Sequence, residues 1–115
     1  GVREVRQGVV PGSVLARFEG SPADQELFRQ GYYHVEGQAS QLAALCVEAK
    51  PGETVLDLCA APGGKSSQLA AALGGWGLLV SNEYVPARAE VLKKSLLPFL
   101  FTSHMDSYAI IVSQF

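Results

Sequence analysis

Two features of this chain are typical of ligand binding: a lysine in a glycine-rich loop, and an acid 18 positions after it. The run Pro62-Gly-Gly-Lys65 cannot continue a strand, and its sharp turn brings backbone amides close to a ligand. Glu83 is the acid, and its spacing is near the roughly 20-residue offset of the ribose-binding acid in dinucleotide folds. A carboxylate there accepts both ribose hydroxyls. The alternative for Glu83 is a solvated acid at a strand end.

Three elements must position these residues. Thr54–Leu58 is short, β-branched and apolar, which is typical of a buried parallel strand. Lys65–Leu73 predicts a helix, and Gly77–Glu83 predicts the next strand, which ends in the acid. The apolar stripe of that helix comprises Leu69, Ala70 and Leu73. Open α/β sheets bind ligands at the carboxyl edge of their strands, and a helix N-terminus there favours carboxylate or phosphate.

The tail of the loop, Gly64-Lys65-Ser66, suggests a phosphate-binding P-loop as an alternative. That motif needs Gly-x-x-x-x-Gly-Lys-Ser/Thr, and Cys59 stands where its first glycine belongs. A Gly-x-Gly-x-x-Gly fingerprint is also absent from this loop. The pattern therefore favours a nucleoside-bearing ligand without a phosphate chain, and a small nucleotide-binding module remains the alternative.

The nine residues Asp57-Leu-Cys-Ala-Ala-Pro-Gly-Gly-Lys65 resemble the S-adenosylmethionine loop of the NOL/NOP/Sun family of RNA 5-methylcytosine methyltransferases, whose bacterial members modify 16S ribosomal RNA. Gly31–Ser40 resembles the family segment just before the methyltransferase core, and Asn82–Arg88 resembles its second ligand motif. The resemblance extends from Gly31 to Leu97 and is loose on either side.

The resemblance implies a fold, a cofactor and a partner. The fold is α/β, a partial Rossmann-like methyltransferase sheet with helices on both faces. The cofactor is S-adenosyl-L-methionine, the partner is ribosomal RNA, and the activity is cytosine-5 methylation. The loop would wrap the methionine part, Glu83 would bind the ribose, and Asp106 would contact the adenine amine. The implied cofactor-binding residues are Cys59, Ala60, Ala61, Pro62, Gly63, Gly64, Lys65, Glu83 and Asp106.

Catalysis in this family uses a cysteine thiolate that adds to C6 of cytosine, which makes C5 nucleophilic toward the methyl sulfonium. The family carries its cysteines downstream, in a Thr-Cys segment and an Asp-Ala-Pro-Cys-Ser-Gly segment, and neither occurs here. Cys59 matches the cofactor loop and not the nucleophile, so no catalytic residue is assigned. We therefore expect a cofactor-binding half that is inactive alone. The alternative is a non-catalytic remnant that folds, or half folds, only with a partner.

Length, net charge and cysteine content limit the classes of protein to which this chain can belong. With 115 residues the chain is one domain at most, divided into an extension over residues 1–30 and a truncated methyltransferase domain over 31–115. The net charge of −2 does not indicate nucleic-acid binding, so the expectation of RNA binding comes from the resemblance alone. Cys46 and Cys59 fit no zinc spacing, predict no metal and indicate a reducing, cytoplasmic compartment. No apolar run predicts a membrane span, the oligomeric state stays open, and the missing initial Met indicates a longer parent protein.

The segments before the loop predict short elements. Ser13–Glu19 alternates like a strand, and Ser21 can cap a short helix that Gly31 ends. Tyr32–Val35 is strand-like, and its His34 is a partly buried polar residue or a contact to RNA or cofactor. Gln38–Lys50 predicts the clearest helix. Its apolar stripe comprises Ala39, Leu42, Ala43, Cys46 and Ala49, with Cys46 as a small core residue.

The segments after the second strand diverge from the family pattern. Pro86–Leu97 predicts a helix with Ala89, Leu92 and Leu96 as its core stripe, and its Arg88 is a cofactor-rim or surface residue. Pro98–Ser103 predicts a third strand, and Tyr108–Val112 predicts a strand in the fourth place. We expect Phe99–Phe115 to be poorly packed, and the chain to be marginally stable or to self-associate through uncovered strand edges.

Overall fold

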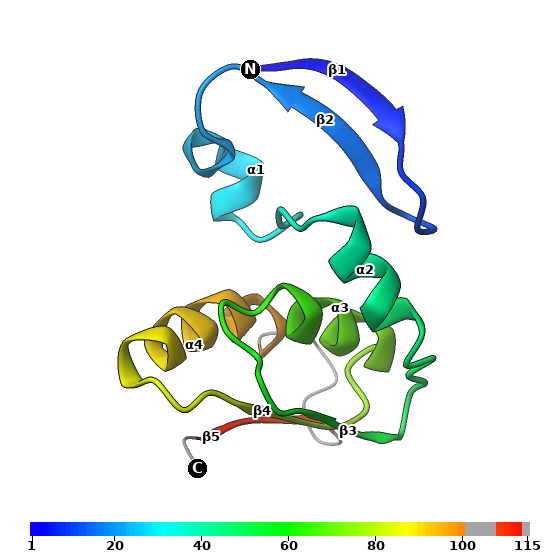
Figure 1. Cartoon of the computed structure of the whole chain (residues 1–115), viewed down its shortest axis with the longest axis vertical. Coiled ribbons are helices and arrows are strands. Elements are labelled where there is room, and N and C mark those ends of the chain that lie inside the picture. Colours follow the sequence, from blue (N-terminus) through cyan, green and yellow to red (C-terminus); the bar gives the residue numbers. More distant parts are fainter. Residues whose placement is uncertain (101–107, 114–115) are drawn as a thin grey trace.

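The computed structural model describes residues 1–100 and 108–113, which contain an antiparallel hairpin and a three-stranded parallel sheet (Figure 1). The hairpin and two short helical segments form the N-terminal part. The parallel sheet, covered by helices, forms the rest. Figure 1 places the hairpin and the parallel sheet at opposite ends of the molecule, so the hairpin does not extend the sheet.

The hairpin consists of β1 (Val2–Gln7) and β2 (Val14–Phe18), which pair antiparallel. The strand expected over Ser13–Glu19 is confirmed as β2. Its turn closes with a hydrogen bond of 3.0 Å from the Ser13 amide to the Val10 carbonyl oxygen. The sequence does not predict β1, because almost all of its side chains are exposed and charged residues interrupt any apolar alternation.

Two short helical segments follow the hairpin. The 3₁₀ turn η1 (Pro22–Asp24) precedes the single-turn helix α1 (Glu26–Arg29). The cap predicted for Ser21 is confirmed, because its side-chain oxygen accepts a hydrogen bond of 3.2 Å from the Ala23 amide. Gly31 follows with a φ of +79°, a left-handed conformation that glycine adopts without strain and that ends the helix as predicted.

The segment Tyr32–Val35 forms no strand, so that prediction is wrong. The segment pairs with no strand in the part of the chain that the structure describes, and its Tyr33 side chain packs against neighbouring rings instead. The Tyr33 ring stacks on Phe18 at a centroid distance of 6.2 Å and meets Phe28 edge-on at 5.7 Å. These ring contacts attach the connecting segment to β2 and α1.

Helix α2 (Gln38–Leu45) is shorter than predicted, and its apolar stripe is not buried. It packs on the next helix through Ala44, which is buried, and through the Gln41 carbonyl oxygen, which accepts a 3.0 Å hydrogen bond from the Gln68 side chain. Leu42 and Cys46 therefore lie on the outer side and are exposed, so the prediction of Cys46 as a core residue is wrong. The helix ends early because residue 48 adopts a positive φ.

The parallel sheet has the order β3-β4-β5 and comprises β3 (Thr54–Asp57), β4 (Gly77–Asn82) and β5 (Tyr108–Ser113). Strands β3 and β4, both expected from the sequence, pair in parallel with Asp57 opposite Ser81. The strand predicted over Tyr108–Val112 is also confirmed, but it pairs parallel with β4 as the third strand of the sheet.

Helix α3 (Gly64–Leu73) connects β3 to β4, and α4 (Pro86–Leu100) connects β4 toward β5. Because α4 continues through Pro98, the third strand predicted over Pro98–Ser103 is wrong for its first residues, and the rest lies outside the described residues. No helix in the described part of the chain is long and apolar enough to cross a membrane.

The core consists of two adjoining clusters that confirm both predicted helix stripes. Phe99 packs against both clusters, so the expectation of poor packing is wrong at that residue. The cluster between α3 and the sheet comprises Val55, Leu69, Ala70, Leu73 and Leu79. The cluster between α4 and the loop after β3 comprises Ala60, Ala61, Leu92 and Leu96.

The sequence predicts helices on both faces of the sheet, whereas the described residues place α3 and α4 on one face (Figure 1). The reason is the strand order. Two right-handed crossovers that move in the same direction across a parallel sheet put both helices on the same side. Leu56 is consequently 55% exposed, although Val55 beside it is buried. The prediction of β3 as a buried strand is thus wrong for the face that carries Leu56.

Candidate functional site

The loop after β3 holds the predicted ligand-binding residues at the carboxyl edge of the sheet. It contains a cis peptide bond between Ala61 and Pro62, and Gly63 has a φ of +117°. Helix α3 begins at the next residue, and the Ser67 amide donates a 2.8 Å hydrogen bond to the Gly63 carbonyl oxygen. The loop therefore leads directly into a helix N-terminus, as the sequence predicts.

Position 63 requires a glycine because the loop lies directly against α4 there. A β-carbon at this position would lie 2.8 Å from the Ser95 β-carbon and 3.2 Å from a methyl carbon of Leu92. Together with its positive φ, this close approach leaves no room for a side chain. The glycine thus lets the loop pack directly on α4.

Two side chains of α4 bind carbonyl oxygens of the loop. Arg88 donates a hydrogen bond of 3.1 Å to the Ala61 carbonyl oxygen. The Ser95 hydroxyl donates a hydrogen bond of 2.8 Å to the Pro62 carbonyl oxygen. Because these carbonyls are turned toward α4, the loop has a defined backbone orientation. Sequence reasoning leaves the role of Arg88 open and does not find Ser95, because both contacts span about 30 positions.

The end of β4 binds the other side of the loop. The Ala60 amide donates a 2.9 Å hydrogen bond to the Asn82 carbonyl oxygen, and the Asn82 side chain donates a 3.0 Å hydrogen bond to the Leu58 carbonyl oxygen. Glu83 is the residue directly after Asn82. The structure therefore brings the loop and the predicted ribose-binding acid together at one edge of the sheet.

Glu83 is only 5% exposed, so it is not the solvated acid of the alternative interpretation. Its Oε1 accepts a hydrogen bond of 3.0 Å from the Val85 amide and lies 3.8 Å from an Arg88 guanidinium nitrogen. Among the described residues no hydrogen-bond donor contacts Oε2. A buried carboxylate beside an arginine, with one oxygen fixed and the other available, can accept hydrogen bonds from a ligand hydroxyl.

Lys65 and Ser66 have positions that disfavour the P-loop alternative. The Lys65 ammonium donates a hydrogen bond of 3.1 Å to the Ser40 hydroxyl of α2. The Ser66 hydroxyl is fully buried and donates to a carboxylate oxygen of Asp57 at 2.8 Å. A P-loop presents that hydroxyl to the metal ion of a nucleotide, whereas here it points into the protein.

Glu36 is a buried acid that sequence reasoning does not single out. Its side chain is 7% exposed, and its Oε2 lies 3.4 Å from the Nε2 atom of His34. Its carboxyl carbon would lie 3.1 Å from a β-carbon built at Gly64. A carboxylate at the first residue of α3 is favourable because the helix dipole is positive there. Nothing in the local sequence pattern distinguishes this glutamate from a surface acid.

The other predicted site residues differ in how exposed they are. In the loop, Ala60 and Ala61 are buried, whereas Cys59 and Pro62 are exposed. Asp106 lies outside the described residues, so its predicted contact has no structural counterpart. Within the described part of the chain, no group of three or more His, Cys, Asp or Glu side chains could hold a metal ion.

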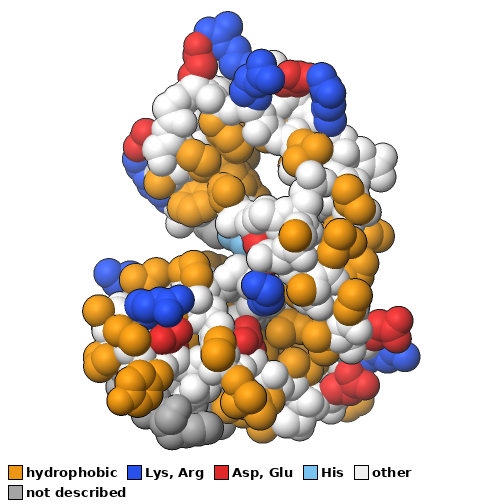
Figure 2. All heavy atoms as spheres, viewed as in Figure 1, with side chains coloured by type: hydrophobic (Ala, Val, Ile, Leu, Met, Phe, Trp, Pro, Cys, Tyr) orange, Lys and Arg blue, Asp and Glu red, His pale blue; other side chains and the backbone are white. Residues whose placement is uncertain are grey.

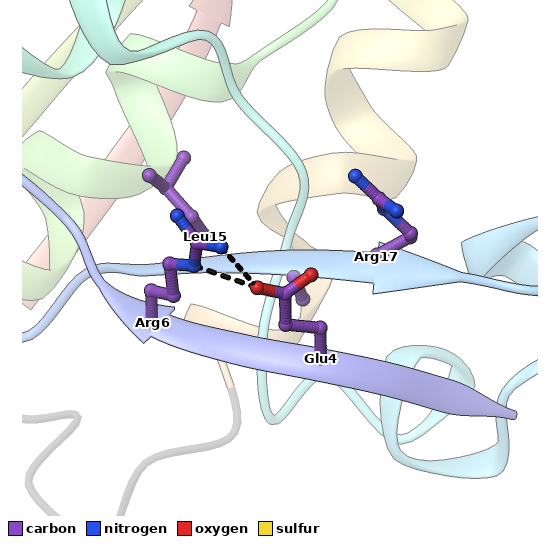
Figure 3. A pocket seen from close by; sticks show the side chains of 5 residues that line it. Glu4, Arg6, Leu15 and Arg17 are labelled. Atoms are coloured by element: carbon purple, nitrogen blue, oxygen red, sulfur yellow. Dashed lines mark hydrogen bonds and ion pairs between the residues drawn. The ribbon is translucent and has the colours of Figure 1, made fainter.

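Two cavities in the described part of the chain lie away from the loop. A cavity of about 590 Å³ lies between the hairpin, residues 31–36 and the outer side of α3 at Ser67 and Gln68. A smaller hollow of about 220 Å³ lies on the hairpin, where Arg6 pairs with Glu4 beside Arg17 (Figure 3). Figure 2 shows basic and acidic side chains alternating over that end of the molecule, so the hairpin has no purely basic surface in this view.

Comparisons with known proteins agree with the family resemblance drawn from the loop sequence. A family model described as "16S rRNA methyltransferase RsmB/F" matches residues 44–106. "Probable ribosomal RNA small subunit methyltransferase B" of Bacillus subtilis (strain 168) is 30% identical over 92 residues, covering 80% of this chain and 21% of that protein. The chain thus spans about a fifth of that relative's length.

Two solved structures are similar in fold. The crystal structure of PH0851 superposes with a TM-score of 0.80 and 28% identity, covering 98% of this chain and 25% of that chain. The crystal structure of NSun6 from Pyrococcus horikoshii with SFG has a TM-score of 0.69 and 22% identity, covering 84% of this chain and 24% of that chain.

These matches confirm the resemblance drawn from Asp57–Lys65. The family model covers more than half of this chain and includes both the loop after β3 and Glu83. The chain belongs to the 16S rRNA methyltransferase RsmB/F family, a family of S-adenosylmethionine-dependent rRNA cytosine-5 methyltransferases.

Proposed function

We propose that this chain is the S-adenosylmethionine-binding half of an RNA cytosine-5 methyltransferase that acts on ribosomal RNA. The observation that carries the proposal is the attachment of the loop after β3 to the end of β4. Asn82 makes two hydrogen bonds to that loop and immediately precedes the buried Glu83. One ligand placed at this sheet edge can therefore reach both parts of the site.

The proposed roles follow the chemistry of the ligand. Residues 59–65 surround the methionine part, with the N-terminus of α3 near its carboxylate. Glu83 accepts the ribose hydroxyls through Oε2, and Asp106 contacts the adenine amine. The cofactor supplies an activated methyl group on a sulfonium. The SFG of the NSun6 structure is an analogue of this cofactor, which supports the choice of ligand.

We further propose that the chain does not catalyse methyl transfer by itself. Both cysteine segments that the resemblance requires are missing from the sequence. Cys59 is exposed, but it lies in the cofactor loop between two residues whose backbone is bound to β4. We assign residues 1–30 to an extension and residues 31–115 to the partial methyltransferase domain. The two free cysteines favour a reducing, cytoplasmic location.

Calorimetric titration of the whole chain with S-adenosylhomocysteine tests the cofactor assignment. We expect binding that Glu83→Ala weakens at least tenfold, because each lost hydrogen bond to a charged group costs about 1.5–3 kcal/mol. The matched control is Glu90→Ala, which removes an exposed glutamate of α4 that pairs with Lys93. Equal affinities of the parent and Glu83→Ala would remove Glu83 from the site.

Two further titrations test the alternatives. Binding of ATP in preference to S-adenosylhomocysteine would favour a small nucleotide-binding module. Binding of neither ligand would favour the non-catalytic remnant and would contradict the proposed function.

A further inference from the structure

Three polar side chains form a buried chain of hydrogen bonds behind the loop. Besides its bond to Asp57, the Ser66 hydroxyl oxygen lies 2.7 Å from the hydroxyl oxygen of Ser81. Both serines are fully buried. The chain joins the end of β3, the first turn of α3 and the end of β4, which are the elements that carry the loop and Glu83.

The direction of this chain follows from the hydrogens available. A serine hydroxyl has one hydrogen, and Ser66 donates it to Oδ2 of Asp57 at 2.8 Å. Ser81 must therefore be the donor in its bond to Ser66. The hydrogen bonds run from Ser81 through Ser66 to the Asp57 carboxylate, and bonds that end on a charge in a buried environment strengthen one another.

The Asp57 carboxylate connects this chain to the loop. Its Oδ1 accepts a hydrogen bond of 3.3 Å from the Cys59 amide, so its orientation affects the first turn of the loop. Ser81 is the register partner of Asp57 and stands two positions before Glu83. A change in the Ser66–Ser81 contact would therefore move the loop relative to Glu83.

We propose that Ser66 and Ser81 are positioning residues that fix the loop of residues 59–65 at the distance from Glu83 that one nucleoside thioether ligand spans. This assignment rests on the proposed function, because it treats the loop and Glu83 as two parts of one cofactor site. Alanine differs from serine only by the hydroxyl oxygen, so replacing either serine removes a hydrogen bond and changes the packed volume little.

Amide hydrogen exchange without ligand is the first test. Ser66→Ala and Ser81→Ala are each expected to speed exchange at the Cys59 and Ala60 amides about tenfold. The matched control is Ser67→Ala, which removes a neighbouring buried hydroxyl that bonds to neither the loop nor β4 among the described residues. Unchanged exchange at both amides in both variants would overturn the proposal.

Ligand size provides the second test. S-adenosylhomocysteine reaches the loop and Glu83, whereas adenosine reaches only the Glu83 side. Each serine variant should weaken S-adenosylhomocysteine about tenfold and adenosine by less than twofold, whereas general destabilisation would weaken both equally. The double variant should lose less than the two single losses combined, because both hydroxyls belong to one chain.

The two tests separate the proposal from the proposed function. Equal losses for both ligands, or fully additive losses, would overturn positioning by Ser66 and Ser81. If the parent chain binds neither ligand while the variants speed exchange at Cys59 and Ala60, the proposed function fails and the positioning role stands.

Discussion

The guanidinium of Arg88 donates a hydrogen bond of 3.1 Å to the carbonyl oxygen of Ala61, 27 positions earlier in the chain. The same side chain lies 3.8 Å from Oε1 of Glu83. One residue of α4 thus contacts both the loop after β3 and the acid after β4. A planar guanidinium with several donors suits this bridging position, whereas an ammonium is a single point charge.

Arg88→Ala should weaken S-adenosylhomocysteine binding about fivefold. The lost hydrogen bond involves a charged donor, but Arg88 is more than half exposed, so we expect a cost of about 1 kcal/mol. Arg88→Lys should recover only part of this loss. Calorimetry measures both variants, and Lys94→Ala, an exposed change on the same helix, is the control. Affinities equal to the parent would show that Arg88 is only a surface arginine.

Gly63→Ala should destabilise the chain by about 2 kcal/mol or more. A non-glycine residue at a φ of +117° costs roughly 1–3 kcal/mol, and its β-carbon would also approach Ser95 to 2.8 Å. Urea unfolding followed by circular dichroism measures the loss. The control is Gly37→Ala, where φ is −64° and no neighbouring atom lies within 4 Å of the added carbon. Similar losses at both positions would contradict the packing of the loop on α4.

The purified chain should not methylate RNA. Incubation with radiolabelled S-adenosylmethionine and unmodified 16S RNA, followed by nucleoside analysis, measures incorporation at cytosine. We expect no methylation because this sequence contains neither cysteine segment that the resemblance requires, and therefore no nucleophile for C6 of cytosine. Robust incorporation that survives Cys59→Ser would refute this prediction. The same assay with an added full-length family member verifies that the RNA is a substrate.

The sheet face that no described helix covers should promote self-association. Leu56 and Leu58 are 55% and 58% exposed, and contiguous exposed apolar side chains favour association. Leu56→Thr should shift the chain toward monomer in size-exclusion chromatography, because threonine keeps strand propensity while reducing apolar area. Val91→Thr on α4, another exposed apolar position, is the control. A parent chain that is already monomeric at high concentration would contradict this expectation.

Much of the fold could be predicted because it depends on local patterns. The Pro62-Gly-Gly-Lys65 turn between an apolar strand and a helix, and the spacing to Glu83, locate both parts of the candidate site. The stripes ending at Leu73 and Leu96 identify the buried helix faces correctly. The Gln38–Lys50 pattern fails, since α2 presents Ala44 to α3 and its apolar stripe to the outside. Periodicity measures which residues share a face, but it does not identify the neighbour that covers that face.

The sequence by itself determined the family and the order of the loop, helix and acid. Only the tertiary structure decided that Glu83 is buried, that Arg88 bridges it to Ala61, and that Ser66 joins β3 to β4. The physical reason is distance along the chain. Turns, caps and helix stripes arise between near neighbours, whereas these hydrogen bonds join residues that meet only after parallel strands have paired and their crossover helices have packed on one face.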